Sequence, residues 1–160
     1  MTVAMYAGTF DPITNGHVDI VNRAVTIYDE VVVSIAHSRS ALFSTEERVD
    51  LARQVLTGIP HVSVTTHSGL TVDAAHENGA QVLVRGLRAI TDFTDEFDMA
   101  LMNRKMAPDI ESAFLMTSLD LLYVSASRVR ELASFGRDVS DLVHPIVFAA
   151  LNEKFPDAGN

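Results

Sequence analysis

The sequence predicts an α/β domain built on a doubly wound, parallel five-stranded sheet with helices on both faces. One observation leads to this fold class. Short apolar runs alternate along the chain with longer segments of helical periodicity, and this alternation requires crossover connections between parallel strands. The 160 residues suit a single domain over residues 1–160, and a hydrophobic fraction of 48% is enough to bury a full core.

The first strand, the first helix and the second strand are expected near the N-terminus. Residues 2–7 form an apolar run that stops at Gly8, which predicts a buried strand. Residues 31–36 are apolar and strongly β-branched and predict the second strand. Between them a helix is expected to begin near Gly16. Its apolar face is formed by Val18, Val21, Ala24, Val25 and Tyr28.

A capping box marks the start of the second helix. Ser44 and Glu47 are spaced so that each side chain can bond the backbone N–H of the other residue. The helix is expected to run from Ser44 to about Thr57, because Gly58 and Pro60 follow it and end a helix in this order.

The rest of the chain continues the alternation of strands and helices. Strands are expected over residues 61–66, 81–84 and 112–116, and helices over residues 72–78, 91–105, 127–135 and 145–155. Gly79 closes the first of these helices, and Pro145 suits the first position of the last one, where its missing N–H costs nothing. The complete order of elements indicates a Rossmann-like sheet of the nucleotide-binding type.

Composition excludes several classes of protein. The chain carries 21 acidic against 12 basic residues, whereas proteins that bind duplex nucleic acid are more often basic, so we expect no nucleic acid partner. No apolar stretch approaches the ~20 residues that cross a membrane, and no signal peptide is visible; we expect no membrane association and a cytoplasmic location. The absence of cysteine excludes disulfides and thiolate zinc sites. Because arginine far outnumbers lysine, an anion site must rely on guanidinium groups, backbone amides and histidine.

The segment after the first strand is the expected ligand site, because parallel sheets bind ligands beyond the carboxyl ends of their strands. It reads GTFDPITNGH from Gly8 to His17. This is neither the G-x-G-x-x-G of dinucleotide-binding oxidoreductases nor the G-x-x-x-x-G-K-[ST] of P-loop hydrolases. Gly16 has no Cβ and lets a ligand approach the backbone. His17, on the first helical turn, can direct a ring N–H at a phosphate, whereas Asp11 and Pro12 are expected to shape the turn.

Three further motifs follow this block in order. Arg85-Gly86-Leu87-Arg88 follows the fourth expected strand, a D-F-x-x-E pattern ends at Glu96, and V-S-x-S-x-x-x-E covers residues 124–131. With these motifs the chain resembles the bacterial phosphopantetheine adenylyltransferases, members of the T/H-x-G-H nucleotidyltransferase superfamily. The resemblance extends from Tyr6 to about Phe155, which is nearly the whole chain.

The resemblance implies a reaction between two anions. The phosphate of 4′-phosphopantetheine attacks the α-phosphorus of ATP, which gives dephospho-coenzyme A and pyrophosphate in coenzyme A biosynthesis. The nucleophile is already ionised, so no general base is needed; the enzyme must align the partners and neutralise charge, with Mg²⁺ as cofactor. No protein ligand is assigned to the metal, because ATP phosphates and water can supply most of its shell. The resemblance also implies a homohexamer.

The family motifs assign roles residue by residue. His17 matches the histidine that stabilises the transition state. The residues matched to ATP binding are Thr9, Phe10, His17, Gly86, Leu87, Arg88, Glu96, Leu121, Leu122, Tyr123, Val124, Ser125, Ala126 and Ser127. Those matched to binding of the phosphopantetheine substrate are Thr9, Arg39, Thr71 and Arg85. Glu96 equally suits the positive end of a helix.

The chain departs from the family pattern at three positions. Arg39 stands where the family usually has a lysine, and its planar fork differs from a lysine ammonium. Ala126 replaces the middle serine of a three-serine run, and Thr71 occupies a position that is usually apolar. Two alternatives therefore remain: a related nucleotidyltransferase with another phosphorylated acceptor, and a nucleotide-binding protein that has lost catalysis.

Other chemistry-bearing residues are expected to be structural. The histidines His61, His67, His76 and His144 have no metal-ligand spacing and are expected on the surface or in loops. Three methionines at helical spacing, Met99, Met102 and Met106, are expected in the core or in a subunit contact.

Overall fold

The computed structural model describes residues 1–158 and contains a five-stranded parallel sheet of order β3-β2-β1-β4-β5. The strands are β1 (Val3–Gly8), β2 (Glu30–Ala36), β3 (Val62–His67), β4 (Val82–Leu87) and β5 (Glu111–Met116). The helices are α1 (Asn15–Ala24), α2 (Thr45–Val55), α3 (Thr71–Glu77), α4 (Ile90–Met106), the 3₁₀ turn η1 (Leu119–Leu121), α5 (Ala126–Ser134) and α6 (Pro145–Lys154). The predicted α/β fold class is confirmed.

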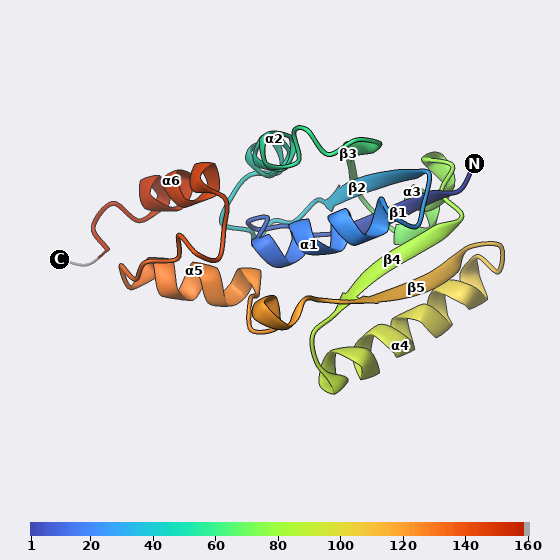
Figure 1. Ribbon diagram of the computed structural model, residues 1–160. Coiled ribbons are helices and arrows are strands. Elements are labelled where there is room, and N and C mark those ends of the chain that lie inside the picture. The colour runs from blue at the N-terminus through green and yellow to red at the C-terminus, as the bar shows by residue number, and fades with distance from the viewer. Residues whose placement is uncertain (159–160) are drawn as a thin grey trace.

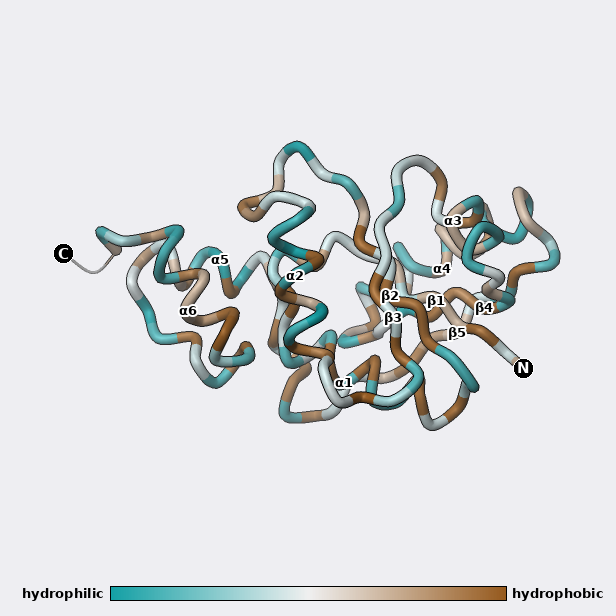
Figure 2. The backbone as a smooth tube through the Cα atoms, turned by 90° about the horizontal axis from the view of Figure 1, so that it is seen from above, coloured by the Kyte–Doolittle hydropathy of each residue, from teal (hydrophilic) through white to brown (hydrophobic). Residues whose placement is uncertain are grey.

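Side chains of the central strands alternate between two cores. Ala4 and Tyr6 of β1 face a large core that includes α1, α2, α5 and α6. Met5 and Ala7 face a smaller core with α3. Helix α4 lies on the α3 face, since Phe93 packs edge-on against Phe114 of β5. The sheet is therefore doubly wound, and the most hydrophobic stretches of backbone follow its strands (Figure 2).

After β3 the chain crosses over to β4, which pairs with β1 on the side opposite β2. Strand order thus reverses between β1 and β4, where α/β sheets leave a crevice at the carboxyl ends of their strands. Helices α5 and α6 lie beyond that end of the sheet, as Figure 1 shows. No helix among residues 1–158 is long and apolar enough to cross a membrane.

Local signals placed most elements correctly. The Ser44–Glu47 capping box is present, and Pro145 begins α6. Two boundaries differ by three residues or more. Helix α1 stops at Ala24 instead of continuing to Tyr28, and its buried face includes Ile20. Strand β4 runs to Leu87, because pairing with β5 continues the ladder through three of the four residues of the R-G-L-R run.

Two structural expectations outside the motifs need correction. His67, at the end of the edge strand β3, is buried, not exposed, because its Nδ1 lies 2.7 Å from the buried hydroxyl of Ser34 on the neighbouring strand β2. The methionines Met99, Met102 and Met106 are exposed and do not belong to the core of this chain. Their predicted alternative, a subunit contact, stays a prediction.

Candidate active site

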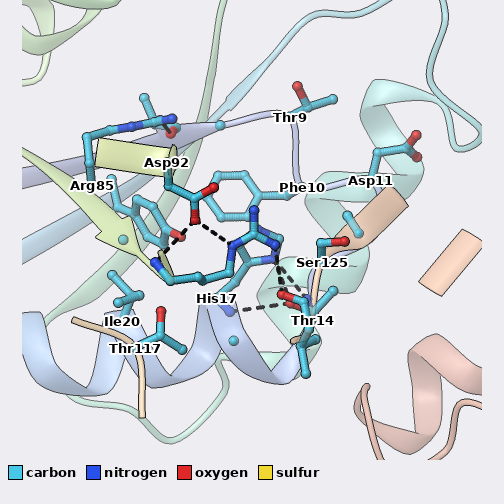
Figure 3. Close-up of a pocket in the computed structure, with 18 of the residues that line it drawn as sticks. Thr9, Phe10, Asp11, Thr14, His17, Ile20, Arg85, Asp92, Thr117 and Ser125 are labelled. Carbon is cyan, nitrogen blue, oxygen red and sulfur yellow. Dashed lines mark hydrogen bonds and ion pairs between the residues drawn. The ribbon is translucent and has the colours of Figure 1, made fainter. Parts of the chain in front are cut away.

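A cavity of about 340 Å³ opens at the point where the strand order reverses (Figure 3). Its walls come from the β1–α1 turn, the end of β4, the start of α4 and the start of α5. Ten residues matched to substrate binding line it: Thr9, Phe10, His17, Arg85, Gly86, Arg88, Glu96, Val124, Ser125 and Ala126. Segments far apart in the sequence therefore converge on one space large enough for a nucleotide.

His17 is fixed by the start of α1. The Thr14 N–H donates to His17 Nδ1 at 3.0 Å, and Thr14 Oγ1 accepts from the His17 N–H at 3.4 Å, which completes a capping box. A ring nitrogen that accepts a backbone N–H carries no proton. The neutral imidazole therefore has its proton on Nε2, the nitrogen left free to act as a donor.

The surroundings of His17 keep the imidazole neutral. Its ring centroid lies 4.8 Å from that of Phe10 and 6.2 Å from that of Tyr6, and it lines the cavity beside them. Burial, reinforced by the charges of Arg88 and Arg85, lowers the pKa of His17 to about 4. At pH 7 the side chain is thus a neutral hydrogen-bond donor rather than a cation.

Arg85 is oriented by a carboxylate from α4. Its Nε and Nη2 donate to the two oxygens of Glu96, each at 2.7 Å, and its Nη1 donates to the Ala7 carbonyl. Burial by itself would lower the pKa of Arg85, but hydrogen bonding to Glu96 and its charge raise that pKa above the ordinary value. A planar fork held on both edges presents its positive charge at the end of β4 in a defined direction.

Arg88 connects two walls of the cavity. Its Nε and backbone N–H donate to Asp92 at 3.1 and 3.2 Å, and its Nη1 donates to the Val124 carbonyl at 3.1 Å. Ser125 then caps α5 by accepting the Arg128 N–H at 3.2 Å. Ala126 occupies the first position of α5, where its N–H has no partner within the helix. The first amides of a helix bind anions through the backbone, so this position needs no hydroxyl for that role.

Gly86 allows α1 to lie close to β4. A Cβ built on Gly86 would stand 2.9 Å from Cγ1 of Ile20, too close for any side chain. The glycine in the R-G-L-R run therefore has a packing function as well as a place in the cavity wall, and it sets the distance between the helix that carries His17 and the strand that carries Arg85.

Other predicted residues lie outside the cavity lining. These are Arg39, Thr71, Leu87, Leu121, Leu122, Tyr123 and Ser127. Arg39 is exposed in the loop between β2 and α2, and Thr71 begins α3. Tyr123 follows η1 and is 66% exposed. Of the residues from Leu121 to Ser127 that were matched to ATP binding, Val124, Ser125 and Ala126, where the chain enters α5, line the cavity.

Sequence reasoning missed several residues of this site. The cavity is also lined by Tyr6, Thr14, Ile20, Asp92, Asp95, Thr117 and Arg130. Asp92 begins the D-F-x-x-E motif, and Arg130 occupies an unspecified position of the V-S-x-S-x-x-x-E motif, so these motifs marked the segments without indicating that the two side chains face the cavity. Asp11 connects the β1–α1 turn to the β2–α2 loop, since its carboxylate accepts the N–H groups of Leu42 and Phe43 at 2.8 and 3.0 Å.

The donor set of the cavity does not form a resident metal centre. Within residues 1–158 no group of three or more His, Asp or Glu side chains is arranged to hold a metal ion. Two of the cavity carboxylates, Asp92 and Glu96, are already bonded to Arg88 and Arg85.

Comparisons with known proteins match this architecture. Residues 5–132 match the model of the cytidylyltransferase-like family. Phosphopantetheine adenylyltransferase of Thiobacillus denitrificans is 51% identical over 156 residues, which cover 96% of this chain and 98% of that protein. The protein of the same name from Hahella chejuensis is 50% identical over 157 residues, 97% of this chain and 98% of that protein.

A solved structure shares the fold at lower identity. Nicotinic acid mononucleotide adenylyltransferase of Plasmodium falciparum, complexed with APC, superposes with a TM-score of 0.69 at 15% identity, covering 98% of this chain and 96% of that one. This match supports the fold alone, whereas the relatives at about half identity define the family. The chain therefore belongs to the cytidylyltransferase-like family and, with those relatives, to the phosphopantetheine adenylyltransferases.

Proposed function

We propose that this protein transfers the adenylyl group of ATP to 4′-phosphopantetheine and releases dephospho-coenzyme A and pyrophosphate. The names of its full-length relatives support the reaction. The observation that carries the mechanism is the neutral imidazole of His17, held by Thr14 with Nε2–H free, beside two oriented guanidinium groups, Arg85 and Arg88.

The proposed chemistry is a direct displacement. A phosphate oxygen of the acceptor attacks the α-phosphorus of ATP, the new P–O bond forms as the bond to pyrophosphate breaks, and the electron pair leaves with pyrophosphate. No proton must be removed from the nucleophile, so the protein needs to supply orientation and donors. His17 Nε2–H and the first amides of α5 would donate to oxygens that gain charge in the transition state.

The two substrates are assigned to different walls. Arg85, with Thr9, is proposed to hold the acceptor phosphate, and Arg88 with the start of α5 to hold the triphosphate. Arg39, in the exposed β2–α2 loop, is proposed to bind the phosphate of the acceptor.

Arg39→Ala tests the assignment of that loop. We expect this variant to raise the KM for 4′-phosphopantetheine about tenfold, because one charge-assisted contact is lost, with the KM for ATP changed less than twofold. Initial rates at varied concentrations of each substrate measure both constants. An equal loss for the two substrates would refute the side assigned to Arg39.

Mg²⁺ is proposed to arrive with the nucleotide. The described carboxylates do not build a resident site, whereas the phosphates of ATP and water can complete the octahedral shell that Mg²⁺ prefers. The metal would accordingly enter the site as part of the MgATP substrate.

A homohexamer is proposed for the assembled enzyme. Helix α4, on the outer side of β5 in Figure 1, exposes an apolar surface made of Ile90, Phe93, Phe97, Met99, Leu101, Met102 and Met106. So large an exposed apolar surface on one helix is typical of a contact between chains. Sedimentation velocity measures the number of chains, and a monomer at micromolar concentration would contradict the proposal.

Pyrophosphate release tests the function directly. The protein is incubated with ATP and Mg²⁺ and either 4′-phosphopantetheine or nicotinamide mononucleotide, and we expect release with 4′-phosphopantetheine. Release with the mononucleotide instead would favour a related nucleotidyltransferase with another acceptor. ATP binding without release in either mixture would favour a nucleotide-binding protein without catalysis.

The proposed reaction takes place in the cytoplasm, where ATP is available.

A further inference from the structure

Arg48 is a fully buried arginine in the first half of α2, with 0% of its surface exposed. Its guanidinium donates to three backbone carbonyls, those of Thr9 at 2.7 Å, Ala36 at 2.8 Å and Phe43 at 3.2 Å, and to the Thr45 hydroxyl at 3.0 Å. Within residues 1–158 no carboxylate forms an ion pair with it. Burying a cation is costly unless its donors are satisfied by hydrogen bonds, and the oxygens that accept these bonds are in turn held in place.

The residue next to its first partner has an unusual backbone. Phe10 has φ = 48°, in the left-handed region that residues with a bulky side chain avoid. Such a conformation costs on the order of 1–3 kcal/mol and persists where the surroundings hold it.

Two arginines hold the carbonyls on either side of Phe10. Arg48 donates to the Thr9 carbonyl, and Arg130 of α5 donates to the Asp11 carbonyl. We call this pair of arginines the Phe10 clamp. Arg130 also lines the cavity, whereas Arg48 is closed off from it. Any effect of Arg48 on substrate must therefore be transmitted through the backbone that it holds.

The clamped residue lies against His17. The Phe10 ring packs edge-on to the imidazole, with centroids 4.8 Å apart and planes at 61°, and in the same way against Tyr6 at 5.2 Å. Figure 3 shows the Phe10 and His17 rings side by side at the centre of the cavity. Phe10 is 3% exposed and Gly8 lies beneath it, where a Cβ would stand 3.2 Å from the ring. The ring therefore has little freedom to shift without disturbing the imidazole.

We propose that Arg48 is a positioning residue: by holding the Thr9 carbonyl it keeps Phe10 in its left-handed conformation, and the Phe10 ring then fixes the His17 imidazole. Its effect on turnover rests on the proposed function. Its effect on His17 does not, and this separates failure of the clamp from failure of the assigned reaction.

The first test follows the imidazole itself. NMR titration of His17, assigned by comparison with His17→Gln, is carried out on the wild type, Arg48→Met and the control Arg53→Met, which alters an exposed arginine of the same helix. Loss of the clamp admits water beside the ring, so we expect the pKa of His17 to rise by about one unit or more in Arg48→Met and to stay unchanged in Arg53→Met. A merely structural role for Arg48 would lower stability and leave this pKa unchanged in the folded protein, which would overturn the proposal.

The second test is a double-mutant cycle with Phe10→Ala. We expect Arg48→Met to lower kcat about 10- to 100-fold in the wild type, since small misplacement of a catalytic group has effects of this size, and less than twofold when Phe10 is already alanine. An equal factor in both backgrounds would overturn the proposal. Should Arg48→Met fail to fold, Arg48→Lys takes its place in both tests, because lysine keeps the charge without the fork; wild-type values in Arg48→Lys would overturn it.

Discussion

The β1–α1 turn and helix α4 border the same cavity, but they are stabilised in different ways. The turn is buried and internally bonded: Phe10, Asp11 and Thr14 are each less than 5% exposed, and each is held by neighbouring backbone or side chains. Within the described chain Asn103 is the one buried residue of α4, and the helix is connected to the cavity through two ion pairs, Glu96 with Arg85 and Asp92 with Arg88.

The difference separates two tasks of the site. The turn holds the group proposed to act on the transition state, and such a group gains most from a position fixed before substrate arrives. Helix α4 orients Arg85, a residue proposed to bind substrate, and leaves an apolar surface open to another chain. Substitutions in the turn should therefore affect turnover, whereas substitutions in α4 should affect binding and assembly.

The largest expected effect comes from the turn. His17→Ala removes a donor directed at charge that develops in the transition state, so we expect kcat to fall about 10²- to 10³-fold or more, with little change in fold. Pyrophosphate release measures turnover, and circular dichroism with thermal melting controls for folding. Turnover near the wild-type value would remove the role assigned to His17.

Acid should destabilise the turn through the same imidazole. The folded-state pKa of His17 is about 4, below its unfolded value of ~6.5, so the unfolded chain binds the extra proton between these values. The stability that His17 contributes is fully present above pH 6.5 and is lost as the pH falls toward 4. We expect the free energy of unfolding to fall by about 2–3 kcal/mol, less than the full pKa difference would give, because the ring faces the cavity on one side. Urea unfolding at pH 7 and pH 4.5 measures the loss; His17→Gln should lack this component, and an identical loss in both proteins would contradict it.

A substitution in α4 should weaken binding instead. Glu96→Gln removes one charged acceptor from Arg85, so the guanidinium loses its fixed direction. We expect the KM for 4′-phosphopantetheine to rise about tenfold and kcat to change less than threefold. Asp98→Asn, an exposed position on the same helix, is the matched control. A fall in kcat with unchanged KM would place Glu96 in the transition-state machinery.

The smallest effect on the chain itself is expected at the exposed side of α4. Met102→Asp introduces a charge into the apolar surface, where Met102 is 54% exposed. We expect assembly to weaken markedly while the stability of the isolated chain changes by less than about 0.5 kcal/mol. Sedimentation velocity and thermal melting at low concentration separate the two quantities. Unchanged assembly would show that this surface is not a subunit contact.

Local patterns in the sequence predicted most of the fold. Apolar runs indicated all five strands, and the Ser44 capping box and Pro145 indicated helix starts, because these signals act within a few residues. The end of β4 was wrong by three residues, since β5 extends its ladder through Leu87 and no local signal reports a partner strand. His67 was misplaced for the same reason: its partner Ser34 is distant in sequence.

The motifs predicted which segments meet at the site, but not how they hold one another. Ten of the matched residues line the cavity. The Glu96–Arg85 fork, the left-handed Phe10 and the buried Arg48 depend on contacts between elements, and the sequence offers no periodicity that reveals them.

Direct transfer between two bound anions is best tested at the reacting phosphorus. ATP with a chiral thiophosphate at the α position is converted by the enzyme, and the configuration of the thiophosphoryl product is determined. A single displacement guided by His17 and the two arginines predicts inversion at phosphorus. Retention would mean two successive displacements through an adenylylated protein, and would contradict a site that supplies only orientation and hydrogen-bond donors.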